Sequence, residues 1–252
     1  MANYRATFGK KIKFLTSDLS MSTATEGEIF YSDTAKDFKV GVSLTAWSSG
    51  PSMNKARQGI MGASAAPATA AIGFGGYAPP IGPNASGGRA QTEEYDGSSW
   101  TEVGDLNTKK FSGAGFGTQT AAIKSGGVDG PYPATRSVNR TESWDGSSWT
   151  EVADVNTIRT DAYHHFGSVT AGLIAGGQNP PNSPNMLTNN ETWDGSSWTN
   201  SPVSLGTARY IHGGGGSTTA AIVFAGKTPS ASQADTTEEL GDTVTLKTIT
   251  DS

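Results

Sequence analysis

Four glutamates recur in this 252-residue chain, each within a similar short stretch. The stretches read TEEY, TESW, NETW and TEEL, and the glutamates at their second position are Glu93, Glu142, Glu191 and Glu238. Carboxyl groups serve many enzymes as general acids and bases. A catalytic site needs one constellation of residues, however, so four copies of the same residue indicate a structural role.

Glu142 and Glu191 carry the clearest expectation about that role. Each lies two residues before a tryptophan, and alternate residues of a strand share one face. A buried carboxylate without a partner would be strongly destabilising. We therefore expect these glutamates to pair with Arg159 or Arg209 at a boundary between repeats, and we predict no catalytic residues.

Metal binding is the other chemistry to test. The chain has no cysteine, which excludes disulfides, thiolate nucleophiles and cysteine metal sites, and its histidines are His164, His165 and His212. His165 and His212 fall in corresponding Gly-rich stretches of adjacent repeats, so they could approach a common axis and hold a cation or ligand. The plainer alternative is that they fill space there, and we predict neither metal nor cofactor.

An aspartate recurs in a seven-residue motif, which reads YDGSSWT at Tyr95–Thr101 and WDGSSWT at Trp144–Thr150 and Trp193–Thr199. Asp-Gly followed by small polar residues is a strong signal for a tight β-hairpin, because Gly accepts positive φ without strain. We expect each aspartate to bond its own backbone, since one such turn offers too few ligands for calcium. These aspartates are Asp96, Asp145 and Asp194.

The motif belongs to a repeat of about 50 residues. Its second tryptophans, Trp100, Trp149 and Trp198, lie 49 residues apart. Apolar stretches with a glycine pair recur beside them: TAAIGFGG, TAAIKSGG and TAGLIAGG, ending at Gly76, Gly127 and Gly177, and a decayed TAAIVFAG. LNTKK, VNTIR and LGTAR connect the units, and the earlier MNKAR matches them and follows its own Trp47.

Each unit is consistent with four short strands, which predicts an all-β, four-stranded-blade β-propeller. We favour five blades over four, because the stretch 28–40 with Trp47 and the stretch 238–250 both look like outer hairpins. Residues 1–27 match no repeat and form either an attachment segment or a closing strand. The predicted organisation is therefore this segment followed by a propeller over residues 28–252.

These features resemble the kelch repeat family over roughly residues 45–240. The matching elements are the glycine pair after an apolar strand, the aromatic-Asp turn, the later tryptophan, and the basic residue that opens the next unit. The style of the repeats is also similar to kelch-like structural proteins of tailed bacteriophages, notably those of cyanobacteria. That second resemblance implies a virion protein, such as the head of a tail fibre.

Two enzymatic propeller families fit the residues poorly. The sialidase Asp-box resembles SxDxGxxW, but Ser143–Trp149 is one residue short between Asp and Gly, and no nucleophilic Tyr stands with an acid and an arginine cluster. Kelch-type copper oxidases need a Tyr–Cys cofactor, which a chain without cysteine cannot form.

The composition excludes further classes. A net charge of −5 provides no basic field for nucleic acid. The longest apolar runs are the length of strands, and the N-terminus lacks the apolar core of a secretory signal, so we expect no membrane insertion.

The connections between the second and third strands vary in sequence while the DGSS turns do not. They span Tyr77–Gln91, Val128–Arg140 and Gln178–Asn190, and strand order puts them on the face opposite the turns. Varied loops on a constant scaffold are typical of binding proteins, although they are equally consistent with tolerant surface loops. The candidate ligand-binding residues are Tyr77, Asn84, Arg89, Tyr132, Arg136, Asn139, Asn179, Asn182 and Asn185.

The expected function is a non-enzymatic virion protein that binds host surface glycan or protein through these loops. Its N-terminal segment would join other virion proteins, and a homotrimer is suggested by the habit of fibres. The alternatives are a head-decoration or neck protein, a polysaccharide-acting enzyme, and a cellular kelch-like scaffold.

Overall fold

The computed structural model describes residues 13–15, 29–32, 35–40, 47–63, 67–78, 87–129, 136–162, 165–179 and 186–241. Its regular elements are strands, and no helix of the described part is long and apolar enough to cross a membrane. The chain forms two compact units, Met1–Gly50 and Pro51–Ser252. The boundary lies at residue 50 instead of the predicted 27.

The first unit contains a small mixed sheet. Strand β1 (Lys13–Leu15) runs parallel to β2 (Ile29–Ser32), which forms an antiparallel hairpin with β3 (Asp37–Val40). The hairpin predicted within residues 28–40 is present, but its parallel neighbour gives it a sheet of its own.

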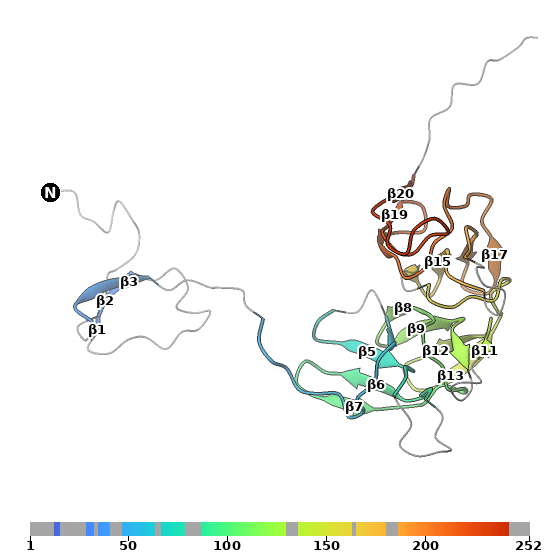
Figure 1. Cartoon of the computed structure of the whole chain (residues 1–252). Helices are drawn as coiled ribbons and strands as arrows, with labels where there is room; N and C mark the ends of the chain where they lie inside the picture. The colour runs from blue at the N-terminus through green and yellow to red at the C-terminus, as the bar shows by residue number, and fades with distance from the viewer. Residues whose placement is uncertain are drawn as a thin grey trace, which may run out of the picture. The chain divides into compact units, whose positions relative to one another are not determined.

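The second unit contains four antiparallel sheets in sequence order (Figure 1). The first sheet is β4 (Met61–Gly62), β5 (Ala71–Phe74), β6 (Thr92–Tyr95) and β7 (Trp100–Glu102). The second sheet is β8 (Ala114–Thr118), β9 (Ala121–Ser125), β12 (Thr141–Trp144) and β13 (Trp149–Val152). The third sheet is β14 (His165–Ser168), β15 (Ala171–Ala175), β16 (Asn190–Trp193) and β17 (Trp198–Asn200).

The fourth sheet has three described strands, β18 (Gly213–Gly216), β19 (Ala221–Phe224) and β20 (Thr237–Leu240). A short hairpin, β10 (Val128–Asp129) with β11 (Arg136–Ser137), lies between β9 and β12. The strand assignments within each repeat match the prediction. Apart from that hairpin, the described residues of the second unit form four sheets, whereas five blades were favoured over four.

The first strands of successive sheets lie side by side, in the order β4, β8, β14 and β18. Their glycines permit this approach: a Cβ at Gly115 would lie 2.9 Å from the Gly62 carbonyl oxygen and 2.7 Å from the Phe74 ring. No contact of comparable extent joins β18 back to β4 within the second unit. Figure 1 shows the row of sheets running from β5–β7 at one end to β19 and β20 at the other.

The core lies between neighbouring sheets, and Trp149 and Trp198, the first residues of β13 and β17, fill it. The ring of Trp149 packs edge-on against Phe74 of the first sheet at 4.8 Å, and Trp198 packs against Phe116 of the second sheet at 6.1 Å. Nε1 of Trp149 also donates to Thr92 Oγ1 at 2.9 Å. Each tryptophan thus seals the junction with the preceding sheet.

Trp47 differs from the other predicted repeat tryptophans. Trp100, Trp149 and Trp198 each begin the last strand of a sheet, whereas Trp47 lies in a stretch without strand structure and is fully exposed. The described part of the chain gives Trp47 no place in a hairpin, because the aromatic-Asp turn that precedes the other three is missing before it.

Candidate binding face

The constant hairpin turns cap one face of the sheets. Asp145 Oδ1 accepts hydrogen bonds from the backbone N–H groups of Ser147 and Ser148, both at 2.8 Å, and from the Ser147 hydroxyl. Asp96 and Asp194 make the same bonds in their own turns. This confirms the predicted turn role of these aspartates.

These bonds stabilise the charged form of each aspartate. Hydrogen bonds from Ser98 and Ser99 lower the pKa of Asp96 to about 2, and those from Ser148 and Ser147 lower the pKa of Asp145 to about 2. Each turn also lies against the connection between the first two strands, since a Cβ on Gly146 would be 3.2 Å from the Thr120 carbonyl oxygen. Both tight turns of a sheet therefore lie on the same face.

The opposite face is organised by the four segments that lead into the sheets, which we call the links. They are Met53–Arg57, Leu106–Lys110, Val155–Arg159 and Leu205–Arg209. The basic residue that ends each link forms an ion pair with the recurring glutamate of the sheet that follows. The pairs are Arg57–Glu93 at 2.9 Å, Lys110–Glu142 at 3.3 Å, Arg159–Glu191 at 2.6 Å and Arg209–Glu238 at 2.6 Å.

The structural role predicted for Glu142 and Glu191 is confirmed, with one correction of partner. Glu191 pairs with Arg159 as expected, but Glu142 pairs with Lys110. Each ion pair joins the link to the sheet that it enters. Both partners are buried in the first three pairs, where a missing partner would cost about 3–5 kcal/mol.

An asparagine in three of the links adds further hydrogen bonds between the link and the sheet that follows it. Asn107 donates its backbone N–H to Glu142 at 2.7 Å and its Nδ2 to the Trp149 carbonyl at 3.0 Å. Asn54 and Asn156 make the corresponding bonds in the first and third sheets. The fourth link has Gly206 here, so only the bond to the glutamate remains.

The second sheet replaces one arginine by two lysines. In the third sheet Arg159 reaches both Glu191 and the Gly176 carbonyl, at 2.6 and 2.9 Å. In the second sheet Lys110 reaches Glu142, and Lys124 donates to the corresponding carbonyl, that of Gly126. Burial, with Lys110 beside it, lowers the pKa of Lys124 well below its usual value.

The glycine pairs connect each sheet to the next link. Gly127 donates its N–H to the Arg159 carbonyl at 2.8 Å, and Gly76 and Gly177 donate likewise to the next basic residue. The first glycine of the pair must stay small: a Cβ on Gly126 would lie 2.7 Å from the Arg159 carbonyl oxygen. Its φ of 60° is also one that residues with a side chain rarely adopt.

The three variable loops rise directly from these glycine pairs, on bases of the same design. The first residue of each loop, Tyr77, Val128 or Gln178, forms an antiparallel bridge with the residue that follows a link, Gln58, Phe111 or Thr160. The same residue pairs across the loop with Gly88, Ser137 or Met186. Varied sequence is thus held on a base fixed by backbone hydrogen bonds, on the face opposite the hairpin turns.

The described candidate residues lie at these bases. The Tyr77 ring packs on Phe111 with centroids 5.4 Å apart, and Arg89 bridges Lys110 through its backbone. Arg136 lies in β11, the Asn139 carbonyl accepts the Val155 N–H, and Asn179 is half-buried just beyond Gln178. Asn84, Tyr132, Asn182 and Asn185 lie outside the described residues.

His164 lies outside the described residues, and the other two histidines lie at the entries of the third and fourth sheets. His212 is buried in the fourth sheet's entry, with Nε2 3.1 Å from the Ala175 carbonyl oxygen, and burial lowers its pKa. His165 lies on β14, and its ring centroid is 6.3 Å from that of Phe116. Over the described residues, no three His, Asp or Glu side chains gather as a metal site requires.

No protein-family model matches the chain, and no curated protein matches it significantly. Solved structures do match, among them that of YjhT, with a TM-score of 0.55 and 10% sequence identity. The match covers 71% of this chain and 60% of YjhT, so this chain spans less than two thirds of that protein. The sheets therefore have the fold of a kelch-repeat β-propeller.

Proposed function

We propose that this chain is a non-enzymatic structural protein of a tailed-phage virion, which binds the host cell surface through its three variable loops. The observation that carries the proposal is the contrast between the two faces. The hairpin turns repeat one sequence and one hydrogen-bond pattern, while the loops vary in sequence above a base that does not vary.

The base matters because it limits the cost of binding. Loops that are anchored at both ends by backbone bonds lose less conformational freedom when a ligand orders them. Their Pro, Asn, Tyr and Arg residues offer rigid turns, hydrogen bonds and flat rings, which suit a glycan or a polar protein surface. The sequence resemblance to phage kelch-like proteins supports the virion assignment, with the N-terminal unit joining other virion proteins.

Binding of the labelled full chain to a panel of intact bacterial cells, with marine cyanobacteria included, tests the proposal. The loop variant replaces residues 79–86, 130–135 and 180–185 with Gly-Ser and leaves the bridged bases untouched. The matched control changes the other face, with Ser98→Ala and Ser147→Ala. We expect the loop variant to lose at least about tenfold in affinity, as for loss of hot-spot contacts, and the control to bind like the parent.

Other outcomes would overturn the proposal. Equal binding by the loop variant would exclude these loops as the receptor site. Release of reducing sugar from the cells would indicate an enzyme. A parent that binds no cell but sediments with phage heads would indicate a head-decoration protein.

A further inference from the structure

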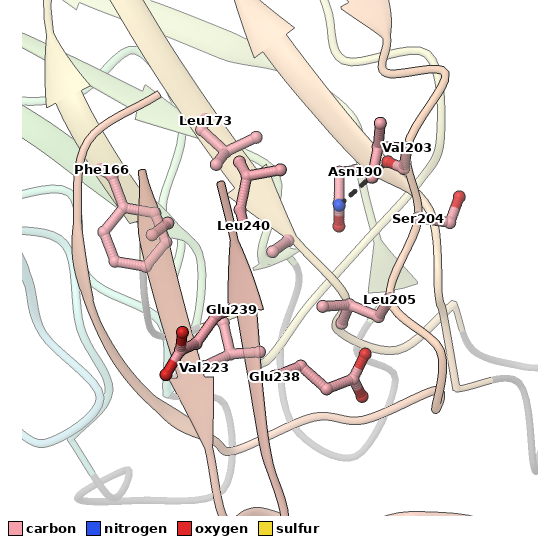
Figure 2. Close-up of a pocket in the computed structure, with 12 residues that line it drawn as sticks. Phe166, Leu173, Asn190, Val203, Ser204, Leu205, Val223, Glu238, Glu239 and Leu240 are labelled. Atoms are coloured by element: carbon pink, nitrogen blue, oxygen red, sulfur yellow. Dashed lines mark hydrogen bonds between the residues drawn. The ribbon is translucent and has the colours of Figure 1, made fainter. Parts of the chain in front are cut away.

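The fourth sheet has a cavity where the second and third sheets have a tryptophan. The cavity has a volume of about 50 Å³, several times what one water needs, and it lies between the third and fourth sheets (Figure 2). Apolar side chains from both sheets line it, among them Phe166, Leu173, Leu205 and Leu240. Beside it, β20 pairs only with β19 in the described part of the chain.

The repeat identifies what the cavity lacks. At the junction of the first two sheets, Trp149 clusters with Ile72, Leu106 and Trp144. At the next junction Trp198 clusters with Ile123, Val155 and Trp193. The equivalent positions at the third junction are Leu173, Leu205 and Leu240, and these line the cavity. Phe166 also corresponds to Phe116, on which Trp198 packs.

A buried polar atom in the cavity wall fits an indole. Trp149 Nε1 donates to Thr92, the first residue of β6, and Asn190 is the corresponding first residue of β16. Asn190 is buried and lines the cavity, and its Oδ1 has no hydrogen-bond partner among the described residues. Its Nδ2 is held by the Val203 carbonyl at 3.1 Å, as Figure 2 shows, which leaves Oδ1 as the acceptor.

One tryptophan of the chain has the spacing of a fourth strand and no sheet to join. Trp47 lies six residues before Met53, as Trp100 lies before Leu106 and Trp149 before Val155. The Trp47 side chain is fully exposed. The exposed indole of Trp47 and the cavity beside β20 are therefore complementary.

The connectivity favours a second copy of the chain as the source. Asn54, seven positions after Trp47, is bonded to Glu93 of the first sheet at 2.6 Å, and seven residues reach at most about 25 Å. The first and fourth sheets are the two ends of the row, and their inner strands make no extensive contact within one chain. The first sheet of another copy can approach the fourth sheet without that restriction.

We propose that the cavity beside β20 receives Trp47 of a second copy of this chain, whose segment Trp47–Gly50 adds to the edge of β20 that no strand of the described residues covers. The contact joins copies head to tail by strand addition. The indole packs on Phe166, and its N–H bonds to Asn190 Oδ1.

Two departures from the repeat make this contact weaker than the internal junctions. Gly206 cannot supply the amide that Asn107 gives to the Trp149 carbonyl. Ala225 stands where Gly126 admits the carbonyl of the next link, so its methyl group must be accommodated. The association is therefore reversible, with a dissociation constant on the order of micromolar.

Sedimentation velocity of the full chain over a concentration series tests the proposal. We expect the parent to associate, Trp47→Ala to remain monomeric, and Trp47→Phe to bind about tenfold more weakly because it lacks the N–H donor. Ile158→Ala, at an exposed residue of the third link, is the matched control and should associate like the parent. Gly206→Asn with Ala225→Gly should tighten association, because the pair restores both missing features.

A mixing experiment separates strand addition from a nonspecific contact. Val203→Trp fills the cavity from its exposed rim but keeps Trp47, whereas Trp47→Ala keeps an open cavity. Neither variant should associate alone, and the mixture should form heterodimers. A monomeric parent, a Trp47→Ala variant that associates normally, or a Trp47→Ala variant that melts earlier as a monomer would overturn the proposal. So would loss of association in a chain ending at Gly241.

Discussion

Lys110 and Lys124 together reach the two acceptors that Arg159 reaches alone in the third sheet. Ile174 occupies the position of Lys124 there, on the same register of the second strand. Burial lowers the pKa of Lys124, so its charged form is less favourable there than in water, while Lys110 forms the ion pair with Glu142. At this single-residue scale, two lysines make the contacts that one arginine makes in the third sheet.

This equivalence predicts a compensated pair of substitutions. Lys110→Ala should destabilise the chain by about 3–5 kcal/mol, because Glu142 would be buried without an ionic partner. Lys124→Ile should cost about 1–3 kcal/mol, because the Gly126 carbonyl loses its donor. The double variant Lys110→Arg with Lys124→Ile should return to within about 1 kcal/mol of the parent. Urea denaturation at pH 7 measures all three, and a double variant no better than Lys124→Ile would contradict the equivalence.

The same variants should also differ in how their stability depends on pH. The unfolded chain binds a proton at Lys124 more tightly than the folded chain does, since folding lowers this pKa. Stability from this group therefore rises with pH between the lowered pKa and the ordinary value of about 10.4. Both variants with Ile at position 124 should lack that rise in the urea midpoint.

At the scale of elements, the glycine pair determines how closely a second strand approaches the next link. Gly126 has positive φ and no room for a Cβ, because the Arg159 backbone carbonyl is 2.7 Å away. Ala225 occupies the same position of the fourth sheet with φ 59°, and no following link lies among the residues that the structure describes. The positive φ alone is thus tolerated, and the approach of the link is what requires glycine.

Gly126→Ala should therefore destabilise the chain by at least about 2 kcal/mol, from strain and a clash with backbone that cannot rotate away. Gly215→Ala in β18 is the matched control, because its Cβ would meet nothing within 4 Å and its φ is not positive. The control should be neutral or stabilising by up to about 1 kcal/mol. Thermal unfolding followed by circular dichroism measures both, and equal melting temperatures would refute the argument.

Strands and turns could be predicted where the sequence signal lies within a few neighbouring residues. Asp-Gly turns and the alternation around TAAI and TESW fix strands and hairpins within a few residues of β9, β12 and β13. The ion-pair partner of each glutamate could not be predicted from neighbouring residues. The recurrence of Glu142 indicates a buried ion pair, but Lys110 and Arg159 both lie within one repeat length of it, and only the fold shows that Lys110 is the partner. The cavity beside β20 had a visible signal, the missing tryptophan after TEEL, but its meaning depends on the packing of Trp198.

The count of sheets failed for a related reason. The hairpin of β2 and β3 has the turn and aromatic residues of a blade, and Trp47 follows at a plausible distance. Its parallel partner β1 comes from a segment without repeat character, and such long-range pairing leaves no periodic trace. In the variable loops the sequence differs while the structure of the base is shared. This base is made of backbone pairings, so the side chains of the loops give no signal for it.

At the scale of the whole molecule, the sheets of residues 51–252 contact mainly their neighbours in a row. The free energy of unfolding of such a row is close to the sum of the contributions of its sheets and of the junctions between them. The two end sheets each have one junction fewer than the inner sheets. A head-to-tail contact adds a junction, so folding and association are linked through the concentration of the chain. In the proposed contact, Trp47 belongs to the compact unit of residues 1–50.

The melting temperature of the full chain should consequently rise by about 1–3 °C for each tenfold increase in concentration around the dissociation constant. A chain of residues 51–252 should keep its far-UV circular dichroism, because every link–glutamate tie lies within it. Its melting temperature should not depend on concentration, since it lacks Trp47. Differential scanning calorimetry of both chains makes the comparison, and a concentration-dependent transition in the shorter chain would show that the junction between copies forms without the added strand.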